Sequence, residues 1–494
     1  MLAIEGLINV GVPYQLEFGE GNVLASSLRV AHGESAYPPL TAQPPYVISP
    51  YGPLLYWIEA PLVRWFGGGS GAGFGAGRLL SLLATFAAGV LLVLLLHRWT
   101  GSWRTALLFG ALYPCLPQVG VWAATMRSDS LAVMLSLAGL YVVAAGDKTR
   151  RWASVLFPAA VFFLAAILVK PTLVAAPAAV FLSMVVRKEW RAALGFGAAM
   201  VTGILLAFFW MQHVTAGAFL VQLAGSHPEP YTLRHYLRVA AMVMREQAIP
   251  TAMLAAFVVV SVKRRALTLP LLFIVMALLS TLSAGMAGAS ANHFMAWGAA
   301  VCIGAGMAYQ LAEESADRFT RALVPLVLFA MVASVLATST LSWLLWNDTS
   351  TTEGPLQAFG KWLPYQQRIF PIDTEVPRDC IELQDYLASL PGKNVVSENT
   401  GAAILAGKTL LVTDPYSYGQ LVLAGKLPGT PLEQMLREHR VDAVVLGQDV
   451  ARLRTADFNR WPPSFLDAVE QNYKWERSFK CAEGRAVYVP RVAP

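Results

Sequence analysis

The sequence predicts a polytopic α-helical membrane protein of about 10–11 spans with a small extracytoplasmic α/β domain at its C-terminal end. The chain has 494 residues, of which 56% are hydrophobic and 14% are charged, and its mean hydropathy is +0.51. A soluble protein of ordinary composition would be about 25% charged. Apolar runs of about 20 residues recur along the chain, and each is long enough to cross a bilayer.

A short apolar stretch, residues 1–15, opens the chain and is too short to cross the bilayer alone. Either a further span begins upstream or the first helix is short. We expect no signal peptide, because the stretch has neither a basic start nor a small-residue cleavage site.

Residues 14–77 are predicted to form the first outer loop. Two carboxylates, Glu17 and Glu20, follow the apolar stretch directly. A carboxylate at the membrane surface can act as a general base on an acceptor hydroxyl or amine. The alternative is a solvated start of a loop helix, with Glu20 near its N-terminus.

The stretch SPYGPLLYWIEAPL at 49–62 is too rich in proline and glycine for the middle of a span. We expect it to end an amphipathic surface segment and to turn the chain back into the membrane. Tyr51, Tyr56 and Trp57 would then lie at headgroup depth, where aromatic rings anchor a chain and can also stack on sugar or isoprenoid.

Candidate spans fall at about 78–97, 105–124, 129–146, 152–169, 171–187, 192–212, 247–262, 267–285, 292–312 and 322–346. Basic clusters occupy every second connection: Arg98 and Arg104; Lys148, Arg150 and Arg151; Arg187, Lys188 and Arg191; Lys263, Arg264 and Arg265; Arg318 and Arg321. The positive-inside rule makes these loops cytoplasmic. The outer loops and everything after 346 then lie outside. The net charge of +6 reflects this orientation and does not indicate nucleic-acid binding.

Ionisable residues at membrane depth are costly and usually functional. Arg127, Asp129, Lys170 and His293 lie at the predicted outer ends of spans, and the outer loop before 247 adds Arg234, His235, Arg238 and Arg245. Each has an ordinary explanation, such as an Arg127–Asp129 pair, a Lys170 helix cap or a core histidine. Together they indicate a bound anion, and a lipid phosphate is the natural one at that depth.

The tail, 347–494, changes character and is predicted to be a separate domain from 1–346. The stretches KNVVSE, KTLLVTD, VDAVVLG and RAVYVP indicate strands, and PLEQMLREHR and FLDAVEQNY indicate amphipathic helices. No catalytic triad or metal-ligand cluster is evident in it, which favours a recognition or lid domain.

Four cysteines occur. Cys115 and Cys302 lie in spans and are expected to be packing residues. Cys380 and Cys481 lie near the two ends of the tail and would face an oxidising compartment. We predict a disulfide between them, with two buried free thiols as the alternative. The sequon at Asn347 would also face outward.

An ordered set of segments resembles the membrane glycosyltransferases of the GT-C fold. These segments are EFGEGNVLASSLRVAHGESAYP, PYGPLLYW followed by GAGRLLSLLA, MRSDSLAVML, LVKPT and ANHF. The set is similar to the dolichyl-phosphate-mannose-protein mannosyltransferase and aminoarabinose transferase group. The likeness covers about residues 14–310. Glutamates replace the usual aspartate of the acidic motif, and Tyr51-Gly52 replaces a Lys-Pro pair.

The resemblance implies an outer carboxylate as catalytic base, with Glu20 preferred because it precedes Gly21 at the loop-helix start, and Glu17 second. It implies a polyprenyl-phosphate-sugar donor held by Arg127, Lys170 and His293. Tyr51, Tyr56, Trp57, Asp129 and Asn292 are the expected substrate-lining residues. The predicted function is sugar transfer, with inversion, to a lipid, glycan or protein acceptor at the outer face of a bacterial inner membrane.

Two other functions stay open. One is transport or flipping of lipid-linked sugars, although no inverted repeat or pair of broken mid-membrane helices is visible. The other is a non-catalytic sugar-binding protein with the tail as its working part. No convincing metal-ligand set is visible, so a divalent metal also stays open as a cofactor.

Overall fold

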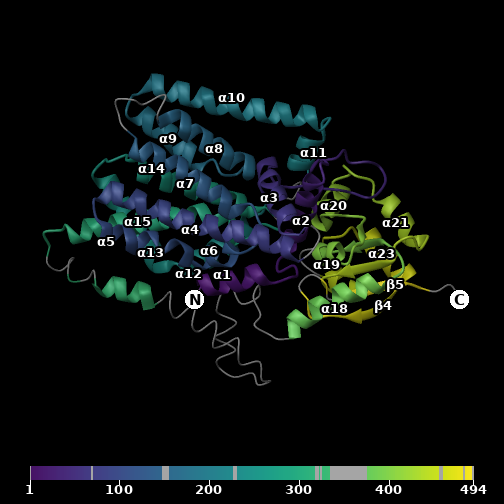
Figure 1. The fold of residues 1–494 in the computed structure, drawn as a ribbon. Coiled ribbons are helices and arrows are strands. Elements are labelled where there is room, and N and C mark those ends of the chain that lie inside the picture. The colour runs from purple at the N-terminus through teal and green to yellow at the C-terminus, as the bar shows by residue number, and fades with distance from the viewer. Residues whose placement is uncertain are drawn as a thin grey trace.

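The structure of the protein is a computed structural model. It describes residues 2–67, 71–146, 155–225, 231–286, 288–317, 322, 325–333, 375–455, 460–481, 484 and 486–491. Within these ranges the chain forms a helical part and a smaller α/β part beside it (Figure 1).

The helical part begins with the elements of the first outer loop and continues with the bundle. The loop elements are α1 (Leu2–Gly11), α2 (Phe18–Ala31) and α3 (Pro53–Trp65). The bundle elements are α4 (Ala72–Thr100), α5 (Trp103–Gly110), η1 (Tyr113–Cys115), α6 (Pro117–Ala123), α7 (Asp129–Ala145), α8 (Phe157–Val169), α9 (Ala175–Val186), α10 (Trp190–Val214), α11 (Ala218–Gly225), α12 (Leu233–Glu246), α13 (Ala248–Lys263), α14 (Leu269–Ser280), η3 (Thr281–Gly285), η4 (Ala291–Phe294) and α15 (Met295–Glu313).

The predicted spans coincide with these apolar helices. By length and composition, three described helices can cross a membrane alone: α4, α10 and the run formed by η4 and α15. Two bent pairs raise that number to five, and α7, α8, α9 and α14 with η3 are shorter apolar helices. The chain is thus a polytopic helical protein, but fewer of its helices than predicted have full spanning length. Of the last predicted span, residues 325–333 are described and helical.

Two bends follow from local sequence. The α5–η1 unit meets α6 at 61°, where Pro114 and Pro117 interrupt the apolar run. The α12 helix meets α13 at 97° around Gln247. If α13 crosses the membrane, α12 therefore lies close to the membrane plane.

Burial separates central from peripheral helices. In the apolar window of the η4–α15 run, 72% of the residues are buried, against 22% for α10. In Figure 1, α10 runs along one edge of the bundle, outside α8 and α9. Its exposed face carries large apolar side chains such as Leu206 and Phe209. Such a face suits contact with lipid tails.

The tail forms a five-stranded mixed sheet with helices on both faces. Its elements are α18 (Glu375–Ser389), β1 (Asn394–Ser397), α19 (Thr400–Leu405), β2 (Thr409–Leu410), α20 (Pro415–Leu423), α21 (Thr430–Arg437), β3 (Ala443–Leu446), α22 (Val450–Thr455), α23 (Pro463–Asn472), β4 (Tyr473–Ser478) and β5 (Ala486–Pro490). The strand order is β2-β1-β3-β5-β4. The β2–β1 and β1–β3 pairs are parallel, and the β3–β5 and β5–β4 pairs are antiparallel.

The strand sequence explains the two-sided burial of this sheet. Val395 packs with Leu383 of α18 on one face, and Val396 packs with Trp461 and Leu436 on the other. Consecutive residues of a strand point to opposite faces, so a strand covered on both sides is apolar throughout. The predicted strands are confirmed as β1, β2, β3 and β5. The edge strand β4 was not predicted, because its residues after Tyr473 are exposed and all but Trp475 are polar.

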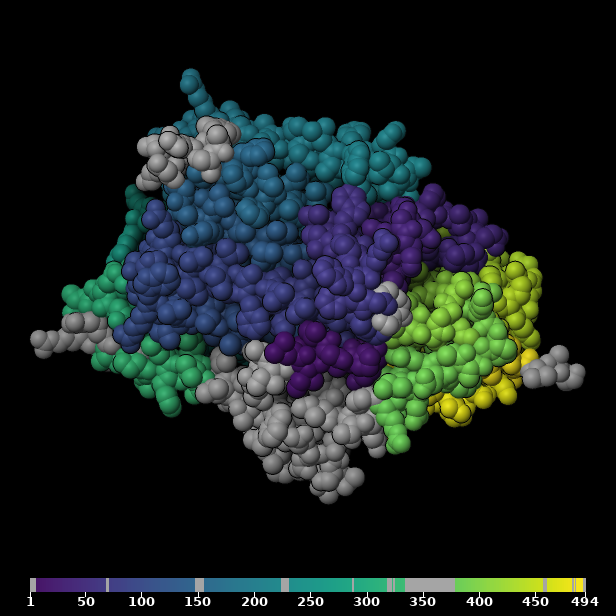
Figure 2. Space-filling model, in the orientation of Figure 1, coloured from purple at the N-terminus to yellow at the C-terminus, as the bar shows by residue number. Residues whose placement is uncertain are grey.

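The tail is docked on the first outer loop. The Tyr46 N–H donates to the Leu411 carbonyl at 2.8 Å, and the Thr413 N–H donates to the Tyr46 carbonyl at 3.1 Å, so the loop adds a short bridge beside β2. The Gly401 N–H donates to Gln15 Oε1 at 2.7 Å. In the space-filling view the green-to-yellow tail abuts the purple surface of the N-terminal segments (Figure 2). The tail therefore sits beside the loop that carries the two candidate bases.

The predicted disulfide is confirmed. Cys380 in α18 is bonded to Cys481, which follows β4, and their Cα atoms are 4.9 Å apart. The bond closes a loop with a sequence separation of 101, which in the chain-entropy model stabilises the domain by about 4–5 kcal/mol. Cys115 and Cys302 are free thiols, half-buried and buried respectively.

Some sequence predictions lie outside the described residues. They are the boundary of the two domains at 346–347, the Asn347 sequon, most of the 322–346 span, and the basic residues at 148–151, 318 and 321.

Candidate active site

The first turn of α2 holds the two candidate bases in different environments. Glu17 is the N-cap of α2, and its Oε2 accepts the Gly19 N–H at 2.8 Å. Glu20 is the third helical residue and reaches back to the backbone of Glu17, which completes a capping box. Two carboxylates at one helix start are stabilised by the partial positive charge of that end.

Glu20 is a buried structural residue. Both its side chain and that of Arg78 are 0% exposed, and Arg78 Nη2 donates to Glu20 Oε2 at 2.6 Å while Nε donates to Oε1 at 2.8 Å. The Leu16 N–H donates to Oε2 at 2.7 Å and the Met126 N–H to Oε1 at 2.9 Å. These four donors occupy the acceptor directions of the Glu20 carboxylate. The geometry therefore favours Glu17 over Glu20 as the candidate base.

Arg78 is a site-supporting residue that the sequence reading missed. It lies near the start of α4 and also donates to three backbone carbonyls, those of Asn9 at 3.1 Å, Val12 at 2.6 Å and Tyr14 at 2.6 Å. It therefore ties α1 and the start of the loop to α4. The sequence feature that could have identified Arg78 is its position as the one arginine within GAGRLLSLLA. It lies at the predicted outer end of a span, where the positive-inside rule does not call for a basic residue.

Glu17 faces a row of alternating charges. Arg127 Nη1 donates to both of its oxygens, at 2.9 and 3.1 Å. The Glu17 and Arg127 side chains are 16% and 13% exposed, so both remain accessible. A Cβ at Gly19 would lie 2.4 Å from Arg127 Nη1, so only glycine at 19 allows this approach.

Asp129 is the centre of the row. Its Oδ1 accepts from Lys170 Nζ and, at 3.1 Å, from Asn292 Nδ2, while Arg127 Nε lies 3.6 Å from Oδ2. Asp129 begins α7, Lys170 ends α8 and Asn292 lies in η4, so three helix ends converge here. The predicted residues Glu17, Arg127, Asp129 and Lys170 thus alternate in charge along one continuous contact path.

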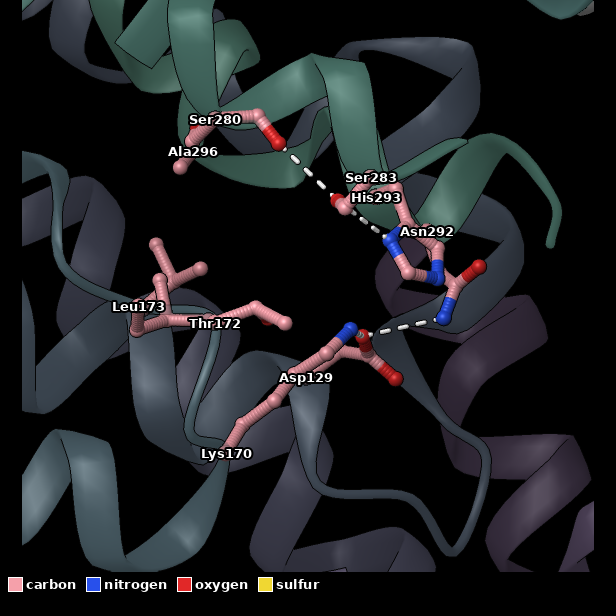
Figure 3. A pocket seen from close by; sticks show the side chains of 10 residues that line it. Asp129, Lys170, Thr172, Leu173, Ser280, Ser283, Asn292, His293 and Ala296 are labelled. Carbon is pink, nitrogen blue, oxygen red and sulfur yellow. Dashed lines mark hydrogen bonds and ion pairs between the residues drawn. The ribbon is translucent and has the colours of Figure 1, made fainter. Parts of the chain in front are cut away.

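A small cavity opens beside this row (Figure 3). Its lining includes Asp129, Lys170, Asn292 and His293. The His293 Nδ1 and the Ser283 hydroxyl are 2.8 Å apart, which holds the ring at the cavity wall opposite Lys170. The cavity therefore presents an ammonium group and an imidazole to a shared space. Arg127 contacts Asp129 but is not part of the lining.

Only one of the three predicted aromatic residues lies by this row. The Arg127 guanidinium carbon lies 5.4 Å from the centre of the Tyr51 ring. Tyr56 is 0% exposed, and its hydroxyl accepts the Tyr51 N–H at 3.2 Å. Trp57 lies edge-to-face on Trp210, with ring centres 5.6 Å apart. Tyr56 and Trp57 do not line the first cavity, because α3 turns Tyr56 into the core and Trp57 toward α10.

The position of Tyr51 depends on the glycine beside it. Gly52 is the N-cap of α3, and its N–H donates to the Val169 carbonyl at 3.2 Å, next to Lys170. A Cβ at Gly52 would lie 2.0 Å from the Leu168 carbonyl oxygen. Gly52 and Pro53 therefore start α3, and the close contact at Gly52 holds the first residues of α3 against the end of α8.

Electrostatics favour Glu17 as a proton acceptor. Burial raises the pKa of Glu17 above its usual value of 4.5, and the Arg127 guanidinium opposes that shift. A raised pKa makes the carboxylate a stronger base. In the described part of the chain, no group of three or more His, Cys, Asp or Glu side chains is placed to hold a metal ion.

Comparisons with known proteins give likeness mainly at the level of fold. No family model matches the chain. A segment is 37% identical over 111 residues to the fluoride-specific ion channel FluC of Xanthomonas euvesicatoria pv. vesicatoria (strain 85-10). That match covers 80% of the channel but 20% of this chain, so it gives no information on the fold of the rest of the chain.

Two solved structures match nearly the whole chain. ArnT from Cupriavidus metallidurans, bound to undecaprenyl phosphate, superposes with a TM-score of 0.61 at 15% identity and covers 100% of this chain and 97% of its own. The apo oligosaccharyltransferase of Archaeoglobus fulgidus superposes with a TM-score of 0.55 at 12% identity and covers 99% of this chain and 74% of its own. Both are GT-C fold glycosyltransferases. The helical part and the small sheet domain of this chain together have the GT-C fold.

Proposed function

We propose that the protein is a membrane glycosyltransferase that moves a sugar from a polyprenyl-phosphate-linked donor to a hydroxyl- or amine-bearing acceptor, with inversion at the anomeric carbon. The observation that carries this proposal is the charge row at the first cavity. Glu17 at one end is a partly exposed carboxylate, and Lys170 at the other end lines the cavity together with His293. The undecaprenyl phosphate bound to ArnT, a protein of the same fold, supports the donor class.

The reaction follows from this arrangement. Glu17 takes the proton from the acceptor as the acceptor oxygen or nitrogen forms its bond to the anomeric carbon. The bond from that carbon to the phosphate oxygen breaks, and the lipid phosphate leaves with the electron pair. Lys170 and His293 stabilise the negative charge that develops on the phosphate. In a site that excludes water, such electrostatic stabilisation is usually the largest contribution to catalysis. Arg127 holds Glu17 in place and Asp129 holds Lys170.

The proposed orientation places the tail and the site on the outer side of a bacterial inner membrane, because the basic clusters of the opposite loops obey the positive-inside rule. Single cysteines introduced into 187–191 and into 415–420 should be labelled by a membrane-impermeant maleimide from opposite sides. Intact cells label only the second, and inverted vesicles label only the first. Labelling of both positions from one side overturns the orientation.

The substitution Lys170→Met should weaken the binding of undecaprenyl phosphate about 10- to 100-fold. A hydrogen bond to a charged group contributes about 1.5–3 kcal/mol, and each 1.4 kcal/mol is a factor of ten. The measurement is the dissociation constant of the purified protein in detergent, by tryptophan fluorescence. Lys170→Arg keeps the charge and should lose less.

The matched control is Lys474→Met, which removes a lysine whose side chain is 53% exposed in the tail. It should leave the dissociation constant unchanged. Thermal unfolding of each variant separates lost binding from lost folding, because Lys170 also neutralises the buried Asp129. An unchanged dissociation constant in a folded Lys170→Met protein removes Lys170 from the phosphate site.

A further inference from the structure

Helix α12 carries charges that the proposed reaction does not use. Arg234, Arg238 and Arg245 are exposed on this helix, and none of the three lines the first cavity. Their positions in the sequence indicated a bound anion, but a phosphate in the first cavity does not account for them. The partner of these arginines therefore has to be read from the surface that α12 forms.

One face of α12 is fixed against the wall of the first cavity. The Tyr236 hydroxyl and Thr281 Oγ1 are 3.2 Å apart, and His235 Nε2 donates to the Ala289 carbonyl at 2.9 Å. Thr281 begins η3 and Ala289 lies between η3 and η4, and η4 supplies His293 to the cavity. These contacts set the rotation of α12, and the opposite face of the helix is left exposed.

The exposed face of α12 alternates large apolar and basic side chains. Leu233 and Leu237 are 61% and 55% exposed, and each is followed directly by an exposed arginine, Arg234 and Arg238 respectively. Residues four apart are neighbours on a helix, so the leucines form one row and the arginines form the row beside it. Within the described residues, no ion pair joins either arginine to a carboxylate. The face therefore offers two uncompensated cations beside an apolar strip.

The place of α12 in the fold puts this face at a membrane boundary. Gly288 lies next to the carbonyl that His235 contacts, and a Cβ at Gly288 would lie 3.0 Å from the Tyr416 ring of the tail. Helix α12 is thus at the end of the bundle that carries the tail. It meets α13 at 97°, so it runs along the membrane surface when α13 crosses. Arginines are costly in hydrocarbon and leucines are better placed out of water, so the boundary between lipid and water suits both.

The chemistry of the face selects its partner. A guanidinium group forms paired hydrogen bonds with phosphate oxygens. The one carboxylate of α12 is Glu246 at its last position, so the helix as a whole is positively charged. A zwitterionic headgroup brings its own cation beside the phosphate, whereas an anionic headgroup does not. The charge of α12 is therefore complementary to anionic phospholipid.

We propose that the exposed face of α12 binds the headgroups of anionic phospholipids in the leaflet on the side of the tail. Arg234 and Arg238 contact the phosphates, and Leu233 and Leu237 enter the upper part of the acyl chains. This binding goes beyond sugar transfer and requires no donor. It holds α12, and with it the wall formed by η3 and η4, at one depth in the membrane.

The test measures lipid contact at α12 itself. A fluorescent thiol label is placed on Ala241→Cys, an exposed position one turn after Leu237, and the full chain is reconstituted into phosphatidylcholine vesicles that contain phosphatidylglycerol. Bromine on the acyl chains of one lipid or the other quenches the label where that lipid is in contact. Brominated phosphatidylglycerol should quench more than its share of the bilayer predicts, and Arg234→Gln with Arg238→Gln should remove that preference. The expected loss in relative lipid affinity is about fivefold for each arginine.

The matched control is Arg378→Gln with Arg452→Gln, which removes the same charge from tail side chains that are 81% and 77% exposed. It should keep the preference for phosphatidylglycerol, and unfolding midpoints confirm that each variant folds. The chain without the introduced cysteine, labelled in parallel, gives the background from its free cysteines.

Three outcomes with the labelled protein overturn the proposal: equal quenching by the two lipids, no quenching by either, or a preference that survives in the α12 double variant. Loss of the preference on adding undecaprenyl phosphate in an amount equal to the protein also overturns it, because the face would then hold the donor's phosphate. A failure of the Glu17 mechanism leaves all of these results unchanged, so the two proposals are tested separately.

Discussion

Glu17→Gln should lower the rate of sugar transfer about 10²- to 10⁴-fold, the usual contribution of a general base. Glutamine keeps the size of the side chain and its oxygen acceptor but cannot take the proton. The loss should appear in kcat with the affinity for undecaprenyl phosphate unchanged, because Glu17 lies at the opposite end of the charge row from Lys170. The measurement is single-turnover transfer by the purified protein, with the donor identified from the lipid-linked glycans that a deletion strain accumulates.

The matched control is Glu34→Gln. Glu34 lies in the same outer loop, has a side chain 54% exposed and pairs only with Arg29 among the described residues. It should transfer at the wild-type rate. Full activity in Glu17→Gln together with a dead, folded Glu20→Gln would return the role to Glu20. Full activity in both would remove the general-base mechanism.

The pH profile gives an independent check on Glu17. Its carboxyl must be ionised to act as a base, so the rate should fall as pH drops through its pKa. Because burial raises that pKa above 4.5, the acid limb should lie above 4.5. Arg127→Met removes the cation that favours the ionised form, so it should move the acid limb to still higher pH. An acid limb at the ordinary carboxyl value in both proteins would contradict this assignment.

Much of the bundle could be read from the sequence, because an apolar run of about 20 residues has few alternatives to a helix in lipid. Helix ends were harder. The run at 105–124 reads as one span, yet Pro114 and Pro117 divide it into α5, η1 and α6. The tail strands were visible where both faces are buried, as in Val395 and Val396, and invisible in β4, whose exposed residues carry no apolar pattern.

The sequence could predict which residues gather at the candidate site, but not which of them is the base and which are structural. Ionisable side chains at outer helix ends pointed to Arg127, Asp129 and Lys170, and these do meet. The choice between Glu17 and Glu20 could not be made from their spacing of three. It depends on which carboxylate faces Arg78, a residue 58 positions after Glu20 that only the folded chain brings near.

Arg78→Met should lower the free energy of unfolding by about 3–5 kcal/mol, the usual cost of removing one partner of a buried ion pair. The change leaves the Glu20 carboxylate, which is 0% exposed, without its cation. The measurement is the unfolding free energy or midpoint of the purified protein in detergent. The control is Arg104→Met, because Arg104 also faces a glutamate, Glu313 at 3.8 Å, but its side chain is 69% exposed. That variant should change stability by less than about 1 kcal/mol.

The double variant Arg78→Met with Glu20→Leu shows what the pair does beyond its own attraction. If the two charges only neutralised each other, an apolar replacement of both would restore stability, as it does for many buried pairs. Here Arg78 also donates to three backbone carbonyls and Glu20 accepts two close backbone N–H groups, at 2.7 and 2.9 Å. The double variant would leave these buried groups unpaired, so it should remain destabilised. Recovery of wild-type stability would show that the pair is dispensable. The expected outcome is that the double variant stays less stable than the wild type while the folded Glu20→Gln protein transfers sugar at the normal rate. That outcome would show that Glu20 and Arg78 hold in place the loop that carries Glu17.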